Sequence, residues 1–115
     1  MLDEPLQLPG WRDPFTVADQ VTWWGATVAA VEQGYDEDVD EYVNELACRD
    51  WLHQAWLRLP DHVVQLWTPR ILALDTRFRA ATTPDDGLFL GRYRRLPHPD
   101  RWWWRRRPRF VVDDG

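Results

Sequence analysis

The strongest constraint on the fold is an apolar seam that repeats at helical spacing between residues 17 and 31. Its members are separated by steps of four, three, four and three: Val17, Val21, Trp24, Val28 and Val31. An α-helix turns every 3.6 residues, so these side chains share one face, which has to be buried against other elements. The helix is expected to begin at Asp13–Pro14 or with Thr16 as its cap. Beside the seam, Ala18, Gly25 and Ala29 would let a second helix approach closely.

A second helix is expected to begin in the acidic run DEDVDEYVNE. Acidic residues suit the first turn of a helix because the helix dipole favours negative charge there. The apolar face then rotates near residue 50, where Asp50 and His53 occupy the side that Tyr42 and Leu46 occupied before. Either the helix breaks there, with Asp50 capping a second piece, or its later part is buried on both sides.

A third apolar seam runs from Val63 to Ala81. Pro69 lies inside it, where proline removes a backbone hydrogen bond and clashes with the preceding turn. We therefore expect a short helix over residues 61–67 and a longer one over residues 69–82.

From Leu88 onward the helical period disappears. The runs LFLGRYRRL and RWWWRRRPRFVV are separated by PHPD, a pattern typical of a hairpin, and Pro108 makes the second run an edge strand or an extended arm. The fold class expected is mainly α: a small bundle of three to four helices with an extended or β-hairpin C-terminal arm. Residues 1–87 would form the bundle and its extended N-terminal lead-in. Residues 88–115 would form an arginine- and tryptophan-rich arm packed on the same single domain.

Charge is distributed unevenly along the 115 residues. Residues 1–50 hold twelve acidic side chains and two arginines, whereas residues 92–109 hold eight arginines and one aspartate, within a net charge of -5. Nucleic-acid-binding domains usually have a strongly basic balance, which this chain lacks. All fourteen basic residues are arginine. This usage is also typical of a GC-rich genome, so we expect a bacterial or phage source.

The expected location is the cytoplasm. The single cysteine, Cys48, excludes an internal disulfide, and Asp3 and Glu4 stand where a signal peptide would be positive. No apolar run exceeds four residues, so no membrane span is predicted.

Catalytic chemistry finds little support in the sequence. Asp50 and His53, three residues apart, would be neighbours on a helix and could act as a general base, but they lack a nucleophile. Cys48 would project about 140° away from His53. The histidines and Cys48 show no metal-binding spacing, and the chain has no glycine-rich phosphate loop. We therefore predict no catalytic residue, no metal site and no cofactor.

The tryptophan triplet of the arm points to a contact surface. In a strand Trp103 would face opposite to its neighbours, and in a helix the three would spread over about 200°. At least one side of the triplet must therefore find another partner: an arginine face, a helix or a second chain. Tryptophan, tyrosine and arginine are enriched at interface hot spots. The predicted partner-binding residues are Tyr93, Arg94, Arg95, Arg101, Trp102, Trp103, Trp104, Arg105, Arg106 and Arg107. The predicted acidic face consists of Asp36, Glu37, Asp38, Asp40, Glu41 and Glu45.

Three function classes follow in order. The first is a non-catalytic protein-interaction module, such as an inhibitor, immunity, antitoxin-like or adaptor protein, which binds a protein partner or a second copy of itself. It would use the arm and the acidic helix face. The alternative is a nucleic-acid-binding accessory protein whose arginines track phosphates and whose tryptophans stack on bases. The third is a small enzyme using Asp50 and His53.

Overall fold

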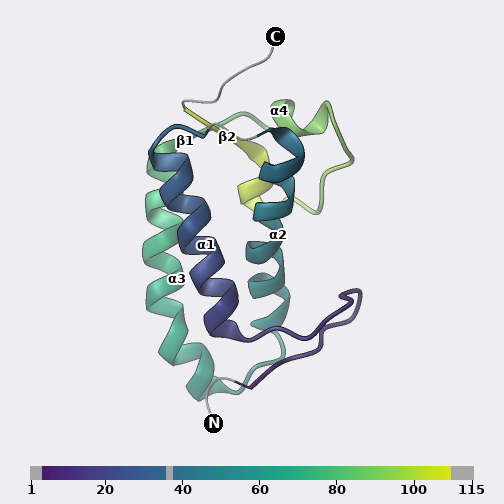
Figure 1. The fold of residues 1–115 in the computed structure, drawn as a ribbon, viewed down its shortest axis with the longest axis vertical. Helices are drawn as coiled ribbons and strands as arrows, with labels where there is room; N and C mark the ends of the chain where they lie inside the picture. The colour runs from purple at the N-terminus through teal and green to yellow at the C-terminus, as the bar shows by residue number, and fades with distance from the viewer. Residues whose placement is uncertain (1–3, 36–37, 110–115) are drawn as a thin grey trace.

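The computed structural model describes residues 4–35 and 38–109. Three long helices, α1 (Val17–Glu32), α2 (Val39–Ala55) and α3 (Asp61–Ala81), run side by side along the molecule (Figure 1). A short strand β1 (Thr82–Pro84), a single helical turn α4 (Leu88–Gly91), a 3₁₀ turn η1 (Trp102–Arg105) and a strand β2 (Arg106–Pro108) complete the chain. The predicted fold class, a small helical bundle with a C-terminal arm, is confirmed. No helix among the described residues is long and apolar enough to cross a membrane.

Helix α1 follows its sequence pattern closely. Thr16 caps it by accepting a hydrogen bond from the backbone N–H of Asp19, and all five residues of the seam are buried. The small residues beside the seam also act as expected. A Cβ atom added to Gly25 would lie 3.8 Å from the side chain of Leu74, so α3 packs directly against this strip.

Helix α2 remains continuous through residue 50. Asp38 is its N-cap, accepting from the backbone N–H of Glu41. Of the two expectations for its second half, burial on both sides is the correct one, since Trp51, Leu52 and Ala55 are all fully covered. Asp50 consequently sits in the middle of a helix and points toward the arm, where it is not free to act as a cap.

The expected break at Pro69 is wrong, because α3 is a single helix of 21 residues. Proline leaves the carbonyl of Gln65 without its usual donor, but both residues are exposed, so water can satisfy that carbonyl. The hydroxyl of Thr68 donates to the carbonyl of Val64 and accepts from Nε1 of Trp56. The turn before the proline is therefore fastened to the end of α2.

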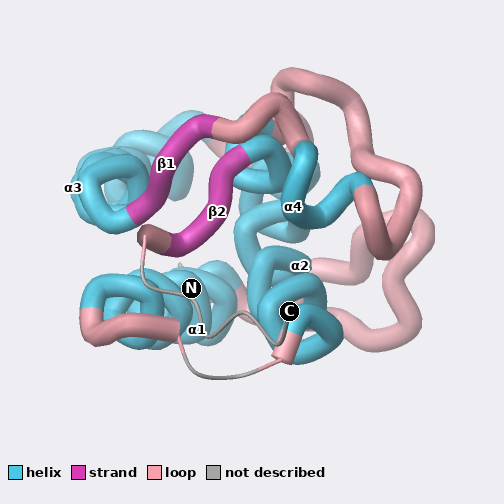
Figure 2. The backbone as a smooth tube through the Cα atoms, turned by 90° about the horizontal axis from the view of Figure 1, so that it is seen from above, coloured by secondary structure: helices cyan, strands magenta, loops and turns pink. Residues whose placement is uncertain are grey.

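The arm closes one end of the bundle in a way the sequence pattern did not predict. The expected hairpin across PHPD is absent from the described residues, and β2 pairs instead with β1, antiparallel, with Thr82 opposite Pro108. The run after Leu88 is helical at its start. Seen from above, the two strands lie beside each other over the end of the bundle, next to α4 (Figure 2).

A buried ion pair ties the three long helices together. Asp75 of α3 is 2% exposed, and its carboxylate accepts hydrogen bonds from Nε and Nη2 of Arg49 in α2, each at 2.9 Å. The same carboxylate accepts a hydrogen bond from Nε1 of Trp24 in α1, at 3.0 Å. A buried charge needs this degree of satisfaction, because removing one partner leaves the other charge desolvated and unpaired.

This arrangement predicts a large stability difference between two ion pairs of similar geometry. Replacing Asp75 by Asn should lower the free energy of unfolding by about 3–5 kcal/mol, the usual cost of breaking a buried pair. Arg77 and Glu32 form an exposed bidentate pair between α3 and α1. The control E32Q should hardly move the urea midpoint, since water screens exposed pairs. Equal midpoint shifts in the two variants would contradict the assignment of Asp75 as a structural centre.

Candidate functional site

Two consecutive tryptophans of the arm converge on one carboxylate. Nε1 of Trp103 and Nε1 of Trp104 each donate to Oδ1 of Asp50, both at 2.8 Å. The tight turn of η1 directs both rings toward α2, and they are 1% and 2% exposed. We call these three residues the indole clamp. It fastens a segment more than fifty residues away in sequence to the middle of α2.

Arginine side chains cover the faces of the tryptophan rings. The guanidinium carbon of Arg49 lies 4.4 Å from the ring centre of Trp103, and that of Arg94 lies 5.0 Å from the ring centre of Trp104. The guanidinium carbon of Arg79, in α3, lies 3.9 Å from the ring centre of Trp102. Planar guanidinium groups stack on aromatic faces in a way that lysine cannot reproduce. Part of the arginine content of the chain is therefore structural.

The electrostatics of the clamp is dominated by burial. Desolvation raises the pKa of Asp50 above its ordinary value, and the two indole N–H groups, Arg101 and His53 offset only part of that rise. The surroundings of the carboxylate thus disfavour its charged form through burial, and the two indole N–H donors favour it.

Asp50 and His53 do not form a hydrogen-bonded pair. Asp50 accepts hydrogen bonds from the two indoles, whereas Nε2 of His53 lies 3.3 Å from Oδ2 of Asp100 on the arm. The ring of His53 also makes an edge contact with Trp103, with ring centres 5.6 Å apart. A hollow of about 160 Å³ beside His53 is lined by Arg49, Thr68 and apolar residues at the facing sides of α2 and α3, but not by Asp50.

Cys48 lies on the other side of α2. Burial raises the pKa of its thiol to about 12, so it is not an activated nucleophile. No group of three or more His, Cys, Asp or Glu side chains within residues 4–35 and 38–109 is placed to hold a metal ion.

The predicted contact residues divide into two groups. Trp103 and Trp104 are covered by the chain itself, so no further partner is needed to bury them. Arg101, Trp102, Arg105, Arg106 and Arg107 are half-buried. Two of these arginines bind backbone carbonyls: Nη2 of Arg105 donates to Pro97, and Nη2 of Arg106 donates to Arg79.

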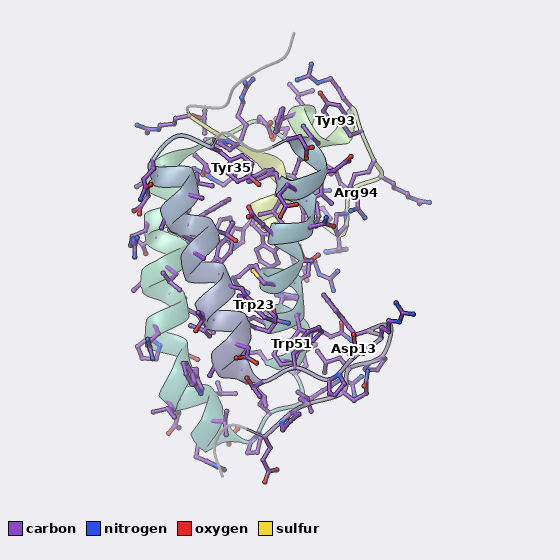
Figure 3. All side chains as sticks on the ribbon, viewed as in Figure 1. Asp13, Trp23, Tyr35, Trp51, Tyr93 and Arg94 are labelled. Carbon is purple, nitrogen blue, oxygen red and sulfur yellow. The ribbon has the colours of Figure 1, made fainter. Side chains whose placement is uncertain are left out.

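The exposed part of the arm lies around α4. Tyr93, Arg94 and Arg95 are exposed, as predicted for contact residues, and Figure 3 shows Tyr93 and Arg94 at the outer edge of the molecule. Leu88, which is 73% exposed, and Arg92 lie beside them and are not among the residues predicted from the sequence. The sequence pattern predicts a strand at Leu88, whereas the structure has it as the first residue of α4, after Gly87 as the N-cap.

The acidic face lies at the same end of the bundle as the arm (Figure 1). Asp38, Asp40 and Glu41 are exposed on the first turns of α2, while Glu45 is half-buried and accepts from the hydroxyl of Tyr35 at 2.6 Å. Asp36 and Glu37 lie outside the described residues. Phe89 of α4 packs on Tyr42, with ring centres 6.3 Å apart, which places the arm against the buried side of the same helical turns.

Comparisons of the chain with protein-family models, with curated proteins and with solved structures find no match. The fold and the site geometry are thus the basis for assigning a function.

The indole clamp predicts a specific hierarchy of substitutions at Asp50. D50L should destabilise the protein by about 1–3 kcal/mol for each indole N–H that loses its acceptor. D50N, whose amide oxygen can still accept, should lose much less. As a control, Q54L removes the acceptor of Trp11 Nε1 at a partly exposed place, where water can substitute. Urea unfolding at pH 7 tests the order, and a Q54L loss as large as that of D50L would contradict it.

The raised pKa of Asp50 also predicts the sign of a pH effect. In the folded protein Asp50 keeps its proton to a higher pH than in the unfolded chain, where an aspartate has a pKa of about 3.9. Stability from this group is therefore complete below that pH and is lost as pH rises through the folded pKa. The unfolding free energy of the wild type minus that of D50N should fall across this interval. A difference that rises with pH would show that the hydrogen bonds outweigh burial.

Proposed function

We propose that the chain is a non-catalytic, stoichiometric protein-interaction module that binds an acidic protein surface through the exposed face of its arm. Inhibitor, immunity, antitoxin-like and adaptor proteins are of this kind, and the partner can be another protein or a second copy of the chain. The binding surface consists of Leu88, Arg92, Tyr93, Arg94 and Arg95. We call it the arm face.

The observation that carries this proposal is that the side chains of the arm face are exposed while its backbone is held in place by the rest of the chain. Leu88 is 73% exposed and Tyr93 is 56% exposed, and three exposed arginines accompany them. The indole clamp holds η1 on α2, and the backbone N–H groups of Gly87 and Phe89 donate hydrogen bonds to the carboxylate of Asp85, which hold the start of α4. A surface that is already ordered loses less entropy on binding.

The composition of the arm face suits a protein partner. Tyrosine and arginine are enriched at hot spots, and an exposed leucine beside them offers an apolar anchor. The guanidinium groups would select carboxylates on the partner, and the acidic face of α2 at the same end would repel wrong orientations. Asp38, Asp40 and Glu41 are the described residues best placed for that role.

The nucleic-acid alternative is weakened by the position of the tryptophans. Base stacking requires an accessible aromatic face. The rings of Trp103 and Trp104 are buried, and Arg79 covers one face of Trp102. An arginine-only contact to phosphates remains as a second candidate, and it is separable by its response to salt.

The proposal predicts that Y93A/R95A abolishes partner binding without unfolding the protein, because both side chains are exposed. The matched control is L72A/R70A on the exposed side of α3, which should bind as the wild type does. Quantitative co-purification from the source organism, with light scattering to detect self-association, measures the effect.

Fluorescence anisotropy with labelled DNA and RNA at low salt forms the second part of this experiment. The proposal predicts no saturable binding to either. A partner retained equally by Y93A/R95A would contradict the arm face as the contact surface, and tight, salt-dependent nucleic-acid binding would favour the alternative.

A further inference from the structure

A second concave surface lies on a different part of the molecule from the arm face. A groove of about 330 Å³ runs between α1 and α2 and is closed at one end by the N-terminal lead-in. Trp11, Phe15 and Trp23 line that end, and Trp23 lies beside the space between the two helices in Figure 3. The short side chains of Ala26 and Ala47 leave the space open further along. This volume is at the small end of ligand sites, enough for a one-ring molecule.

Gln20 gives the groove an unusual polar feature. Its side chain lines the groove and is 2% exposed, yet its carbonyl oxygen Oε1 accepts no hydrogen bond within the described structure. Buried polar atoms are nearly always paired. Oε1 accepts only from N–H or O–H groups, so a ligand that carries such a donor into the groove would satisfy it.

The charges around the groove select among donors. Glu41 and Glu45 line it from α2, and none of the described residues that line it is positively charged. At its aromatic end, Trp23 is 46% exposed, and Phe15 supports it with ring centres 5.7 Å apart. An exposed indole face attracts cations and apolar rings alike. The field and the rings together favour an aromatic cation over a neutral or anionic ligand.

We propose that this groove is a binding site for a small organic cation that combines one aromatic ring with an ammonium or amidinium group. The ring packs on Trp23 and Phe15, one N–H donates to Oε1 of Gln20, and the positive charge faces Glu41 and Glu45. The site does not involve the arm face, so it stands or falls independently of the proposed function.

Three probes that share a phenyl ring but differ in charge test the proposal on the full chain. These are phenethylammonium, 2-phenylethanol and 3-phenylpropionate, titrated while the NMR signal of the Trp23 indole N–H is followed. Phenethylammonium should bind saturably and at least tenfold more tightly than the other two. Equal binding of the three probes, or no saturable binding of phenethylammonium, overturns the proposal.

Variants locate the binding. A26L places a larger side chain in the groove from an exposed position and should abolish binding. Its control, A73L, adds the same group at an exposed alanine of α3 and should bind as the wild type does. Q20L should weaken phenethylammonium binding at least tenfold, because it removes the acceptor Oε1. Unchanged binding in A26L overturns the site.

A peptide with the sequence of residues 88–96 serves as a fourth probe. If this peptide alone saturates the Trp23 signal while the three small molecules do not, the groove belongs to a second copy of the chain. That outcome also overturns the small-cation proposal.

Discussion

One oxygen atom of Asp50 fastens the 3₁₀ turn η1 of the arm to the middle of α2. It accepts both indole N–H groups of Trp103 and Trp104, and without it two large rings would bring two unpaired donors into the core. Their burial in turn fixes η1 and the strand that follows. The position of η1 therefore depends on a carboxylate in the middle of α2, whereas α4 is also held by Asp85 and β2 by its pairing with β1.

The indole clamp is continuous with the ion pair that joins the long helices. Arg49 binds Asp75 of α3 through two hydrogen bonds and at the same time lies over the ring of Trp103. The position of the arm is thus coupled to the packing of α2 on α3 through one guanidinium group. Arg77 and Glu32 join α3 to α1 at the surface through two hydrogen bonds to each other.

The sequence predicted what depends on local periodicity and failed where tertiary context decides. The seam of α1 could be inferred because it needs only neighbours along the chain, and the same local pattern gave Thr16 as one of two possible starts of the helix, beside Asp13–Pro14. Continuity of α3 through Pro69 could not, because its cost depends on whether the carbonyl of Gln65 reaches water. The pairing of residues 82–84 with residues 106–108 also escaped prediction, since three-residue strands carry almost no alternation.

A signal for the clamp was nevertheless present in the sequence. Asp50 falls on a helix face that Tyr42 and Leu46 mark as buried, and a buried carboxylate requires donors. Indole N–H groups only donate, so a chain with nine tryptophans has many donors in need of acceptors. A comparison of the buried acceptors with the indole N–H donors therefore favours a tryptophan over His53 as the partner of Asp50.

The same accounting explains why the arm has both arginine and tryptophan in such quantity. A tryptophan whose N–H is satisfied inside still has ring faces to cover, and a stacked guanidinium covers a face while keeping its own N–H groups available at the edge. Arg94 does this over Trp104, and Arg92 lies near the rings of Phe89 and Tyr93. Arg92 and Arg94 are exposed while they cover rings of the arm, whereas Arg49 over Trp103 gives its N–H groups to Asp75. A surface of this kind is already ordered before it binds, so it can recognise carboxylates at a smaller cost in entropy. This is the physical basis for placing the proposed partner contact there.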